Sequence, residues 1–435
     1  MAVFAGGAGD SHWGPVPPEA DSTTATFGNR PMPLWEGVIY WPYRVITYPI
    51  KLIGIGIGAG IGYVDEHRIL AFLFRPPGVI RLEPDITAGG LSGFGGGLAV
   101  RHTAFFGEGN ELKARVYATV NGDQKFTLGL KFPVAAVGEL QLGTGFRDRA
   151  NARYFGIGPE SRVLDRSYYR QRMWWAGTTY AHRLTAKLYL AGGVIFNGVS
   201  AGEPGGDFQP SIYERWADNP PFGLGLRSEG VTVGLGLTHE NAPLDGRPTR
   251  GGVRRAIVTY FHGLSQEDAR YWQFRAELQQ YVPLWFAHHA LALRGFVSWM
   301  DPVGDREIPF QRLMFNDDPD LLRGYNDYRW RDRGLAVLSA EYRWPLWAYQ
   351  YPQGSGMDLY FLADVGQVFG EFKQISADHL TVSYGLGIRL VSSRGFILRL
   401  EWSNSNEGSV FRLRTDQIFQ FHPRLFSGRD PIPAR

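Results

Sequence analysis

Ser200 has neighbours that suggest a catalytic nucleophile, because it lies in the stretch Gly198-Val199-Ser200-Ala201-Gly202. The G-x-S-x-G spacing activates a serine only where a strand turns sharply into a helix, which exposes the hydroxyl beside a base. Here a strand-like run leads into a loop rich in Gly and Pro instead. We therefore interpret the spacing as a coincidence that predicts no hydrolase.

Three other stretches carry polar side chains that suit catalysis or metal binding. Gly9-Asp10-Ser11-His12 has a residue order found in some esterases, but it lies in a segment rich in Gly, Pro, Ser and Thr. His288 and His289 are adjacent, and adjacent strand residues point to opposite faces, which does not suit one metal ion. The run 316–320 offers oxygen ligands for calcium, although a solvated loop is the favoured interpretation. We expect no enzyme, no metal site and no cofactor.

Arg323 is a candidate for binding and not for catalysis. It lies in Leu322-Arg323-Gly324-Tyr325, inside a polar segment that runs from Asp301 to Arg333. Its guanidinium is a planar fork of donors that binds carboxylates bidentately, which lysine cannot do. Gly324 lets the backbone approach another surface closely or take a positive φ. By itself the tetrapeptide favours an ordinary surface turn, so its interpretation depends on the elements around it.

Composition excludes several classes of protein. The 435 residues include no cysteine, which rules out a disulfide framework and a thiolate metal site. A net charge of +3 gives no sign of nucleic-acid binding. The mean hydropathy of −0.21 is that of a soluble protein. A membrane barrel has a similar average, because apolar and polar residues alternate along its strands.

From Ile80 onward the hydrophobic pattern has a period of two, which predicts strands. The predicted strands lie close to residues 80–90, 94–106, 110–121, 123–133, 138–148, 166–183, 185–198, 228–240, 252–263, 268–282, 287–301, 334–348, 356–370, 378–391, 394–404 and 409–421. Their number is even, as bacterial single-chain barrels require, and several exceed the roughly 9–11 residues that cross the hydrocarbon.

The last five predicted strands show what each face carries. Apolar residues such as Leu338, Phe361 and Leu400 occupy one face, while Arg399 and Glu401 lie on the other. A soluble β-sandwich is the alternative, but it would bury these charges in its core, which is expensive without partners. We therefore predict an all-β fold, a 16-stranded antiparallel transmembrane barrel with lipid outside and charges in the lumen. Aromatic residues near strand ends are expected to form interfacial girdles: Trp174, Trp175, Trp272, Tyr281, Trp285, Trp344 and Trp347.

Three motifs in this order resemble the bacterial outer-membrane assembly family, the BamA/TamA or bacterial surface antigen barrels. The motifs are Leu322-Arg323-Gly324-Tyr325, the run 339–346 and the run 361–366. In that family a long extracellular loop folds back into the lumen, and the arginine of its (V/L)-R-G-(F/Y) tip meets acidic residues on the two following strands. The resemblance thus implies an inward-folded loop in which Arg323 contacts Glu341 and Asp364. Both carboxylates fall on the predicted charged face.

A second stretch, 153–161, resembles the family's R-(F/Y)-(F/Y)-G-(L/I)-G-N-x-(S/T) segment, with Pro159 in place of Asn. The resemblance covers residues 80–421. Before this barrel we expect a mobile leader, 1–34, and a helical segment, 35–79, in which Gly54, Gly58 and Gly62 form a stripe suited to close packing. Family members usually carry POTRA domains, and the segment 35–79 is too short for an array of them. Residues 422–435 are expected to be a C-terminal tail.

The resemblance implies a bacterial outer-membrane barrel that inserts or exports polypeptide, or lipid, without bond chemistry. We expect a lateral seam between the first and last strands, with outer-membrane lipid, client polypeptides and a soluble periplasmic partner as its contacts. The predicted seam residues are Pro84, Gly89, Gly90, Phe419 and Phe421. In the first strand the proline removes a backbone donor and the glycines have no side chain to pack. The two phenylalanines lie at the end of the last strand. A passive channel or a plugged structural barrel is the alternative.

Overall fold

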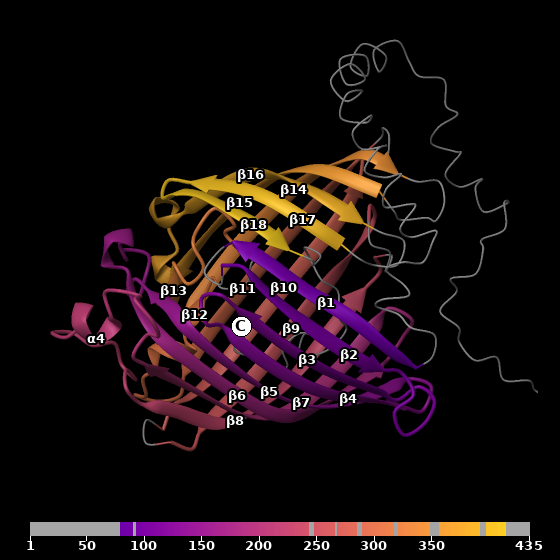
Figure 1. Ribbon diagram of the computed structural model, residues 1–435, viewed down its shortest axis with the longest axis horizontal. Coiled ribbons are helices and arrows are strands. Elements are labelled where there is room, and N and C mark those ends of the chain that lie inside the picture. Colours follow the sequence, from indigo (N-terminus) through magenta and orange to yellow (C-terminus); the bar gives the residue numbers. More distant parts are fainter. Residues whose placement is uncertain are drawn as a thin grey trace, which may run out of the picture.

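The computed structural model describes residues 79–89, 93–242, 248–265, 268–284, 289–316, 321–348, 356–391 and 397–414. Within these residues 16 antiparallel strands form one closed barrel, and β12 and β13 form a separate two-stranded sheet. Figure 1 shows the tilted strands as a cylinder, with α4 projecting at one end. The barrel predicted from the alternation of the sequence is confirmed.

The strands of the barrel are β1 (Ile80–Gly89), β2 (Gly95–His102), β3 (Glu111–Thr119), β4 (Gln124–Val134), β5 (Gly138–Tyr154), β6 (Ser167–Arg183), β7 (Leu188–Gly202), β8 (Arg227–Glu240), β9 (Gly251–Gly263), β10 (Arg270–Pro283), β11 (Ala290–Pro302), β14 (Gly334–Ala348), β15 (Gly356–Phe369), β16 (Thr381–Val391), β17 (Ile397–Ser405) and β18 (Gly408–Arg414). The other elements are η2 (Val163–Asp165), α4 (Ile212–Arg215), η3 (Phe310–Arg312), β12 (Met314–Phe315), β13 (Arg331–Asp332), η4 (Phe372–Gln374) and η5 (Ala377–His379). The longer connections, including the one from β11 to β14, lie at the α4 end, which identifies that end as extracellular.

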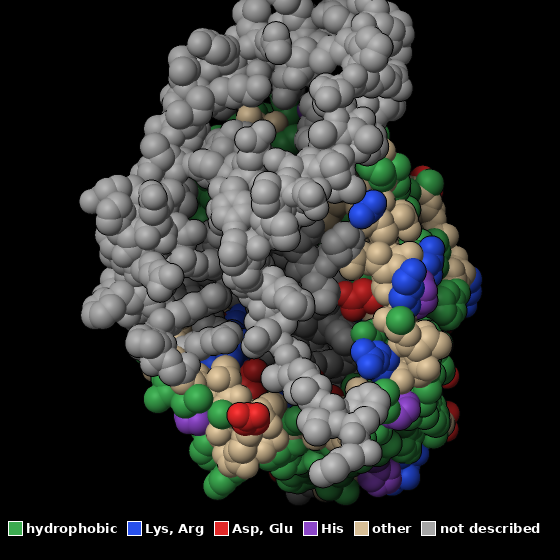
Figure 2. Space-filling model, turned by 90° about the vertical axis from the view of Figure 1, so that its right-hand side faces the viewer, with side chains coloured by type: hydrophobic (Ala, Val, Ile, Leu, Met, Phe, Trp, Pro, Cys, Tyr) green, Lys and Arg blue, Asp and Glu red, His purple; other side chains and the backbone are tan. Residues whose placement is uncertain are grey.

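The two faces of the wall differ as the alternation requires. Leu338, Phe361 and Val382 are exposed on the outer face, whereas Glu341 and Asp364 on the same strands are buried inside. Figure 2 looks onto the opposite end from α4: apolar side chains gather along the outer rim, and charged side chains also lie nearer the middle. An apolar outer face exposes no unpaired charge to lipid, so the strand pattern and the membrane setting agree.

Strand β5 differs from its predicted end at residue 148 and continues to Tyr154. The register with β6 shifts between Arg149 and Ala152, so β5 contains a bulge there. A bulge adds a residue to one strand and breaks the period of two. The predicted strand therefore stopped where the alternation did, although the backbone pairing goes on.

The predicted aromatic girdle is correct only in part. Trp272 is exposed on the outer face, but Trp175 and Tyr281 are buried in the interior, 4% and 1% exposed. Trp174 and Trp175 are adjacent in β6, so only one of them can face lipid. The side chains of Trp285 and Trp347 lie outside the described residues.

Several expectations concern parts of the chain that are not described. The predicted leader and tail, Gly90, Phe419 and Phe421 all fall outside the described residues, as do residues 35–78 of the predicted helical segment 35–79. Among the residues that are described, no helix is long and apolar enough to cross a membrane.

The main hydrophobic cluster of the described residues lies inside the barrel. Wall residues such as Tyr169 and Phe261 pack there against Phe310, Leu322 and Tyr328, which belong to the connection between β11 and β14. This connection therefore folds inward, and its side chains form much of the core that the barrel encloses.

Candidate functional site

The inward connection, of which residues 303–316 and 321–333 are described, is called the lumen loop below. The segment that enters the lumen and the segment that returns, called the two legs of the loop, pair in the β12–β13 hairpin. In this hairpin Met314 faces Asp332 and Phe315 faces Arg331. Asn316 strengthens this junction because its side chain donates to the Asn326 carbonyl at 3.0 Å and accepts from the Trp330 N–H at 2.9 Å. Asn316, the described residue of the calcium candidate 316–320, therefore holds the two legs of the loop together.

The tip of the lumen loop is a tight turn. Leu322 has a φ of 53°, and the N–H of Tyr325 donates to its carbonyl at 2.9 Å. A Cβ at position 324 would lie 2.5 Å from both the Asn404 carbonyl oxygen and the Ser383 Cβ. Gly324 is required here because the tip backbone touches the barrel wall at that point.

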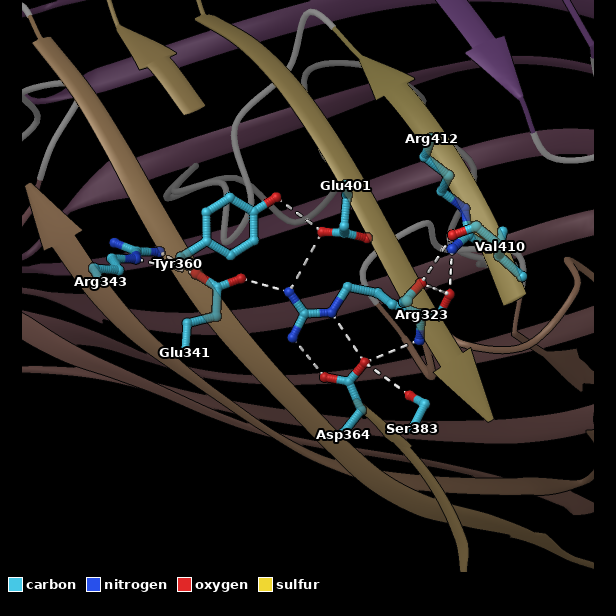
Figure 3. A network of polar contacts seen from close by, with 10 residues as sticks. Arg323, Glu341, Arg343, Tyr360, Asp364, Ser383, Glu401, Val410 and Arg412 are labelled. Carbon is cyan, nitrogen blue, oxygen red and sulfur yellow. Dashed lines mark hydrogen bonds and ion pairs between the residues drawn. The ribbon is translucent and has the colours of Figure 1, made fainter. Parts of the chain in front are cut away.

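Arg323 points from this turn into a pair of carboxylates on the wall (Figure 3). Its Nε and Nη2 donate to the two oxygens of Asp364 at 2.9 and 2.6 Å, and its backbone N–H donates to Asp364 Oδ2 at 2.9 Å. Its Nη1 donates to Glu341 Oε1 at 2.5 Å. All three side chains are buried, so the contacts are shielded from water. Glu341 comes from β14 and Asp364 from β15, the two strands that follow the loop.

Further charged groups surround this pair. Arg323 Nη1 lies 3.8 Å from Glu401 Oε2, and the hydroxyl of Tyr360 donates to the same oxygen at 3.0 Å. The second oxygen of Glu341 accepts from Arg343 at 2.9 and 3.0 Å. Strong pairing compensates for the loss of water around these buried charges. The sequence placed Glu401 on the charged face but did not identify it as a neighbour of Arg323.

The backbone of the tip is bound as well, by residues that the sequence did not single out. Ser403 Oγ donates to the Arg323 carbonyl at 2.6 Å, and Arg412 donates to the same carbonyl. Ser405 Oγ donates to the Gly324 carbonyl at 2.8 Å, and Arg412 Nη2 reaches the Tyr325 carbonyl at 3.0 Å. Strands β17 and β18 therefore hold the tip by its main chain, while β14 and β15 hold it by its arginine.

The other side of the lumen loop is fastened to the opposite wall. Arg312 donates to Asn197 on β7 and to Ser228 on β8, at 2.8 and 2.5 Å. Tyr328 donates to Gln171 on β6 at 2.9 Å and accepts from Arg149 on β5. The loop thus connects the wall formed by β5–β8 with the wall formed by β14–β18.

Arg331 is buried among aromatic rings at the base of the loop. Its guanidinium carbon lies 4.7–5.9 Å from five ring centroids: Tyr154, Tyr169, Phe310, Phe315 and Tyr328. It donates to the Phe310 carbonyl at 2.5 Å and to the Tyr169 hydroxyl at 3.0 Å. Aromatic faces attract a cation, so these rings hold Arg331 in place.

The second family-like stretch also meets the lumen loop. Arg153 donates to the Asn326 side chain at 2.7 Å, and the N–H of Gly158 donates to the Arg331 carbonyl at 2.8 Å. Ser161 accepts from Arg329 through its hydroxyl, at 2.8 Å, and through its carbonyl, at 2.7 Å. Residues 153–161 therefore form a seat for the returning leg of the loop.

The described seam residues lie together on β1. Gly89 is paired with Arg412 of β18, and Pro84 faces Leu98 of β2.

Two candidates for chemistry have structural positions instead. Ser200 lies within strand β7, so its G-x-S-x-G stretch does not form the strand-to-helix turn of a hydrolase. His289 is buried, and its Nδ1 lies 2.6 Å from the Tyr342 hydroxyl.

Comparisons with known proteins agree with this architecture. A sequence search among curated proteins gives no match. Among solved structures, the fold is similar to BamA from Haemophilus ducreyi lacking POTRA domains 1–3, with a TM-score of 0.58 and 15% identity, over 78% of this chain and 70% of that one. It is also similar to CdiB from Escherichia coli (TM-score 0.53, 12% identity, 77% of this chain and 62% of that one) and CdiB from Acinetobacter baumannii (0.50, 13%, 77% and 59%). The chain thus spans less than two thirds of either CdiB. The model of the Omp85 superfamily domain matches residues 104–421, so the chain belongs to the Omp85 superfamily and is a β-barrel protein of the bacterial outer membrane.

Proposed function

We propose that this barrel inserts or exports polypeptide, or lipid, through a lateral seam between β1 and β18, with a separate soluble periplasmic partner that delivers the client. Membership of the Omp85 superfamily supports an assembly or translocation role in general. The lateral route rests on the way the barrel closes.

The closure between β1 and β18 is the observation that carries the proposal. Strand β1 pairs with β18 at Thr87, Ala88 and Gly89, and this pairing joins the first strand of the barrel to the last. No turn connects β1 to β18, so the two strands close the cylinder by pairing and not by a covalent connection. Pro84 also removes a donor from β1, which is better tolerated on an edge strand than in a fully paired one.

The lumen loop supports an opening on the β1 side. Arg412 belongs to the seam strand β18, and its guanidinium binds the carbonyls of Arg323 and Tyr325. Arg323 in turn is held by β14 and β15. Strand β18 is therefore fastened to the loop and through it to the neighbouring wall, so β1 is the edge that moves.

A passive channel is the alternative, and the packing of the loop argues against a steady wide pore. Phe310, Leu322 and Tyr328 join wall residues in one buried cluster inside the barrel. In planar bilayers we expect low resting conductance and cross-links to an added client. A steady, selective conductance with no client contact would favour the channel.

A disulfide across the seam tests the proposal. The variant Ala88→Cys/Leu413→Cys places cysteines at paired positions of β1 and β18, and the chain has no native cysteine to interfere. The matched control, Ala363→Cys/Tyr384→Cys, joins paired positions of β15 and β16 away from the seam. Insertion of an unfolded outer-membrane barrel protein into proteoliposomes is measured before and after reduction. We expect oxidation to stop insertion only in the seam variant; full activity of the locked seam contradicts lateral opening.

A further inference from the structure

A row of polar side chains crosses the outer wall near the extracellular ends of β5 to β8. The strand register places Asp148, Arg172, Ser200 and Arg227 side by side. The neighbours of Ser200 along β7, Val199 and Ala201, are buried inside the barrel, so the serine faces outward. This row lies outside the lumen and has no contact with the lumen loop among the described interactions.

An aromatic surface lies directly below this row. The rings of Trp174 and Phe196 are in contact, with centroids 4.9 Å apart. A Cβ at position 198 would lie 2.4 Å from the Trp174 indole nitrogen, so the indole covers the backbone of Gly198, two residues from Ser200. Further toward the middle of the barrel, Val194 and Val233 are exposed on the same face. The polar row therefore marks the border between the lipid-facing surface and the extracellular loops.

The two arginines of the row have unused donors. Asp148 is engaged mainly by Arg170, at 2.7 and 2.6 Å, and receives only the Nε of Arg172, at 3.2 Å. Within the described part of the chain, the terminal nitrogens of Arg172 have no partner, and its side chain is 53% exposed. Arg227 has one loose ion pair, 3.6 Å from Glu229, and is 72% exposed. Arg172 and Arg227 thus flank Ser200 on the neighbouring strands β6 and β8, and each has exposed guanidinium nitrogens.

We propose that Arg172, Ser200 and Arg227 form a binding site on the outer wall for the phosphate group of an outer-leaflet lipid. Neighbouring strands are about 4.8 Å apart, so the arginines of β6 and β8 start about 10 Å apart, and both can reach a group above Ser200. Guanidinium forks match phosphate oxygens bidentately, and the serine hydroxyl adds one donor.

The surface below the row identifies a lipid as the occupant. A lipid bound by its phosphate at this height has its acyl chains beside Trp174, Phe196 and Val194, where apolar surface faces outward. A free phosphate ion makes no use of that surface. The site is independent of the seam, which lies between β1 and β18, so this inference stands whether or not the seam opens.

The test measures binding of bisphosphorylated lipid A to the full chain in detergent, by native mass spectrometry and titration. The variant Arg172→Gln/Arg227→Gln removes both charges. The control Arg183→Gln/Arg254→Gln removes two exposed arginines at the periplasmic ends of β6 and β9. Heat-modifiable mobility on gels verifies that both variants are folded barrels.

We expect the Arg172/Arg227 variant to bind lipid A about 100-fold more weakly, because it loses two charge-assisted contacts that each contribute roughly a factor of ten. The control variant should bind lipid A like the wild type. Ser200→Ala should weaken binding less, about two- to five-fold, because it removes one hydrogen-bond donor and no charge. Dephosphorylated lipid A should bind the wild type as weakly as lipid A binds the double variant.

Three outcomes overturn the inference. Equal affinity of wild type and the Arg172/Arg227 variant shows that these arginines do not bind the lipid. Equal affinity for lipid A and its dephosphorylated form shows that the apolar wall binds without the phosphate. Inorganic phosphate that displaces lipid A at equal concentration shows that the site is selective for the ion and not for a lipid.

Discussion

Arg323 binds Asp364 through three nitrogen atoms, its backbone N–H, Nε and Nη2, at 2.9, 2.9 and 2.6 Å. The side-chain contacts fix the guanidinium, and the backbone contact fixes the turn from which it emerges. One carboxylate on β15 therefore sets both the position and the direction of the loop tip. Glu341 binds the remaining end of the guanidinium, so the tip has one favoured orientation against the wall.

Removal of this arginine should release the tip without unfolding the barrel. Arg323→Ala leaves Glu341 and Asp364 buried with fewer partners, and breaking a buried ion pair costs about 3–5 kcal/mol. We expect a heat-modifiable barrel whose lumen loop is cut rapidly by added protease, and reduced insertion activity. Arg306→Ala is the control, because that loop arginine is partly exposed and pairs with Asp268. Equal protease resistance of wild type and Arg323→Ala would show that the arginine does not hold the loop.

Gly324 should tolerate no side chain. A Cβ there would lie 2.5 Å from the Asn404 carbonyl oxygen, which belongs to the wall and cannot yield without disturbing β17. Gly324→Ala should therefore displace the tip, with a loss of about 1–3 kcal/mol typical of overpacking. Gly202→Ala is the control, because nothing lies within 4 Å of its Cβ position. Hydrogen exchange of the loop amides measures the difference, and unchanged exchange in Gly324→Ala would contradict the tight contact.

Asp332 should make the base of the lumen loop sensitive to pH. Burial raises the pKa of its carboxyl from 3.8 to about 6, while the N–H of Arg333 donates to it at 2.7 Å. The unfolded loop releases this proton at a lower pH than the folded loop does. Folding of the loop is therefore favoured at low pH. The free energy of unfolding the loop falls by up to about 1.4 kcal/mol per pH unit as the pH rises from about 4 to about 6.

The measurement is protease sensitivity of the loop between pH 7.5 and 5. We expect the wild-type loop to become more resistant as the pH falls. Asp332→Asn cannot ionise and should show a weaker pH dependence, with higher resistance at pH 7.5. The same pH dependence in both proteins would assign it to another group.

The sequence was sufficient for most of the barrel because the lipid-facing and lumen-facing residues alternate along each strand. The same alternation placed Glu341 and Asp364 on the inner face, next to each other in strand order. It failed at the β5 bulge, where the period of two breaks between Arg149 and Ala152. It also failed for Trp175, whose size favoured a girdle although its neighbour Trp174 already takes the outward position.

The remaining contacts of the site depend on how the loop lies against the wall. Ser403 and Ser405 bind carbonyl oxygens of the tip, and every peptide offers the same acceptor, so residue types did not single them out. The aromatic neighbours of Arg331 come from β5, β6 and the loop itself, which only the folded chain brings together. Such groupings have no local spacing that a sequence displays.

Arg331 should be a second anchor, separate from Arg323 and different in chemistry. It is 1% exposed, and among the described residues its hydrogen-bond acceptors are a carbonyl and a phenol hydroxyl, with aromatic faces around its plane. Arg331→Lys keeps the charge but loses the planar fork, so at least one acceptor loses its donor at a cost of about 1–3 kcal/mol. We expect protease cleavage near the β12–β13 hairpin, whereas Arg323→Ala should be cut near the tip. A double variant should show both sites of cleavage, and Arg306→Lys should show neither. If Arg331→Lys opened the tip instead of the hairpin, the two arginines would act as one anchor and the division of the loop into a tip and a base would be wrong.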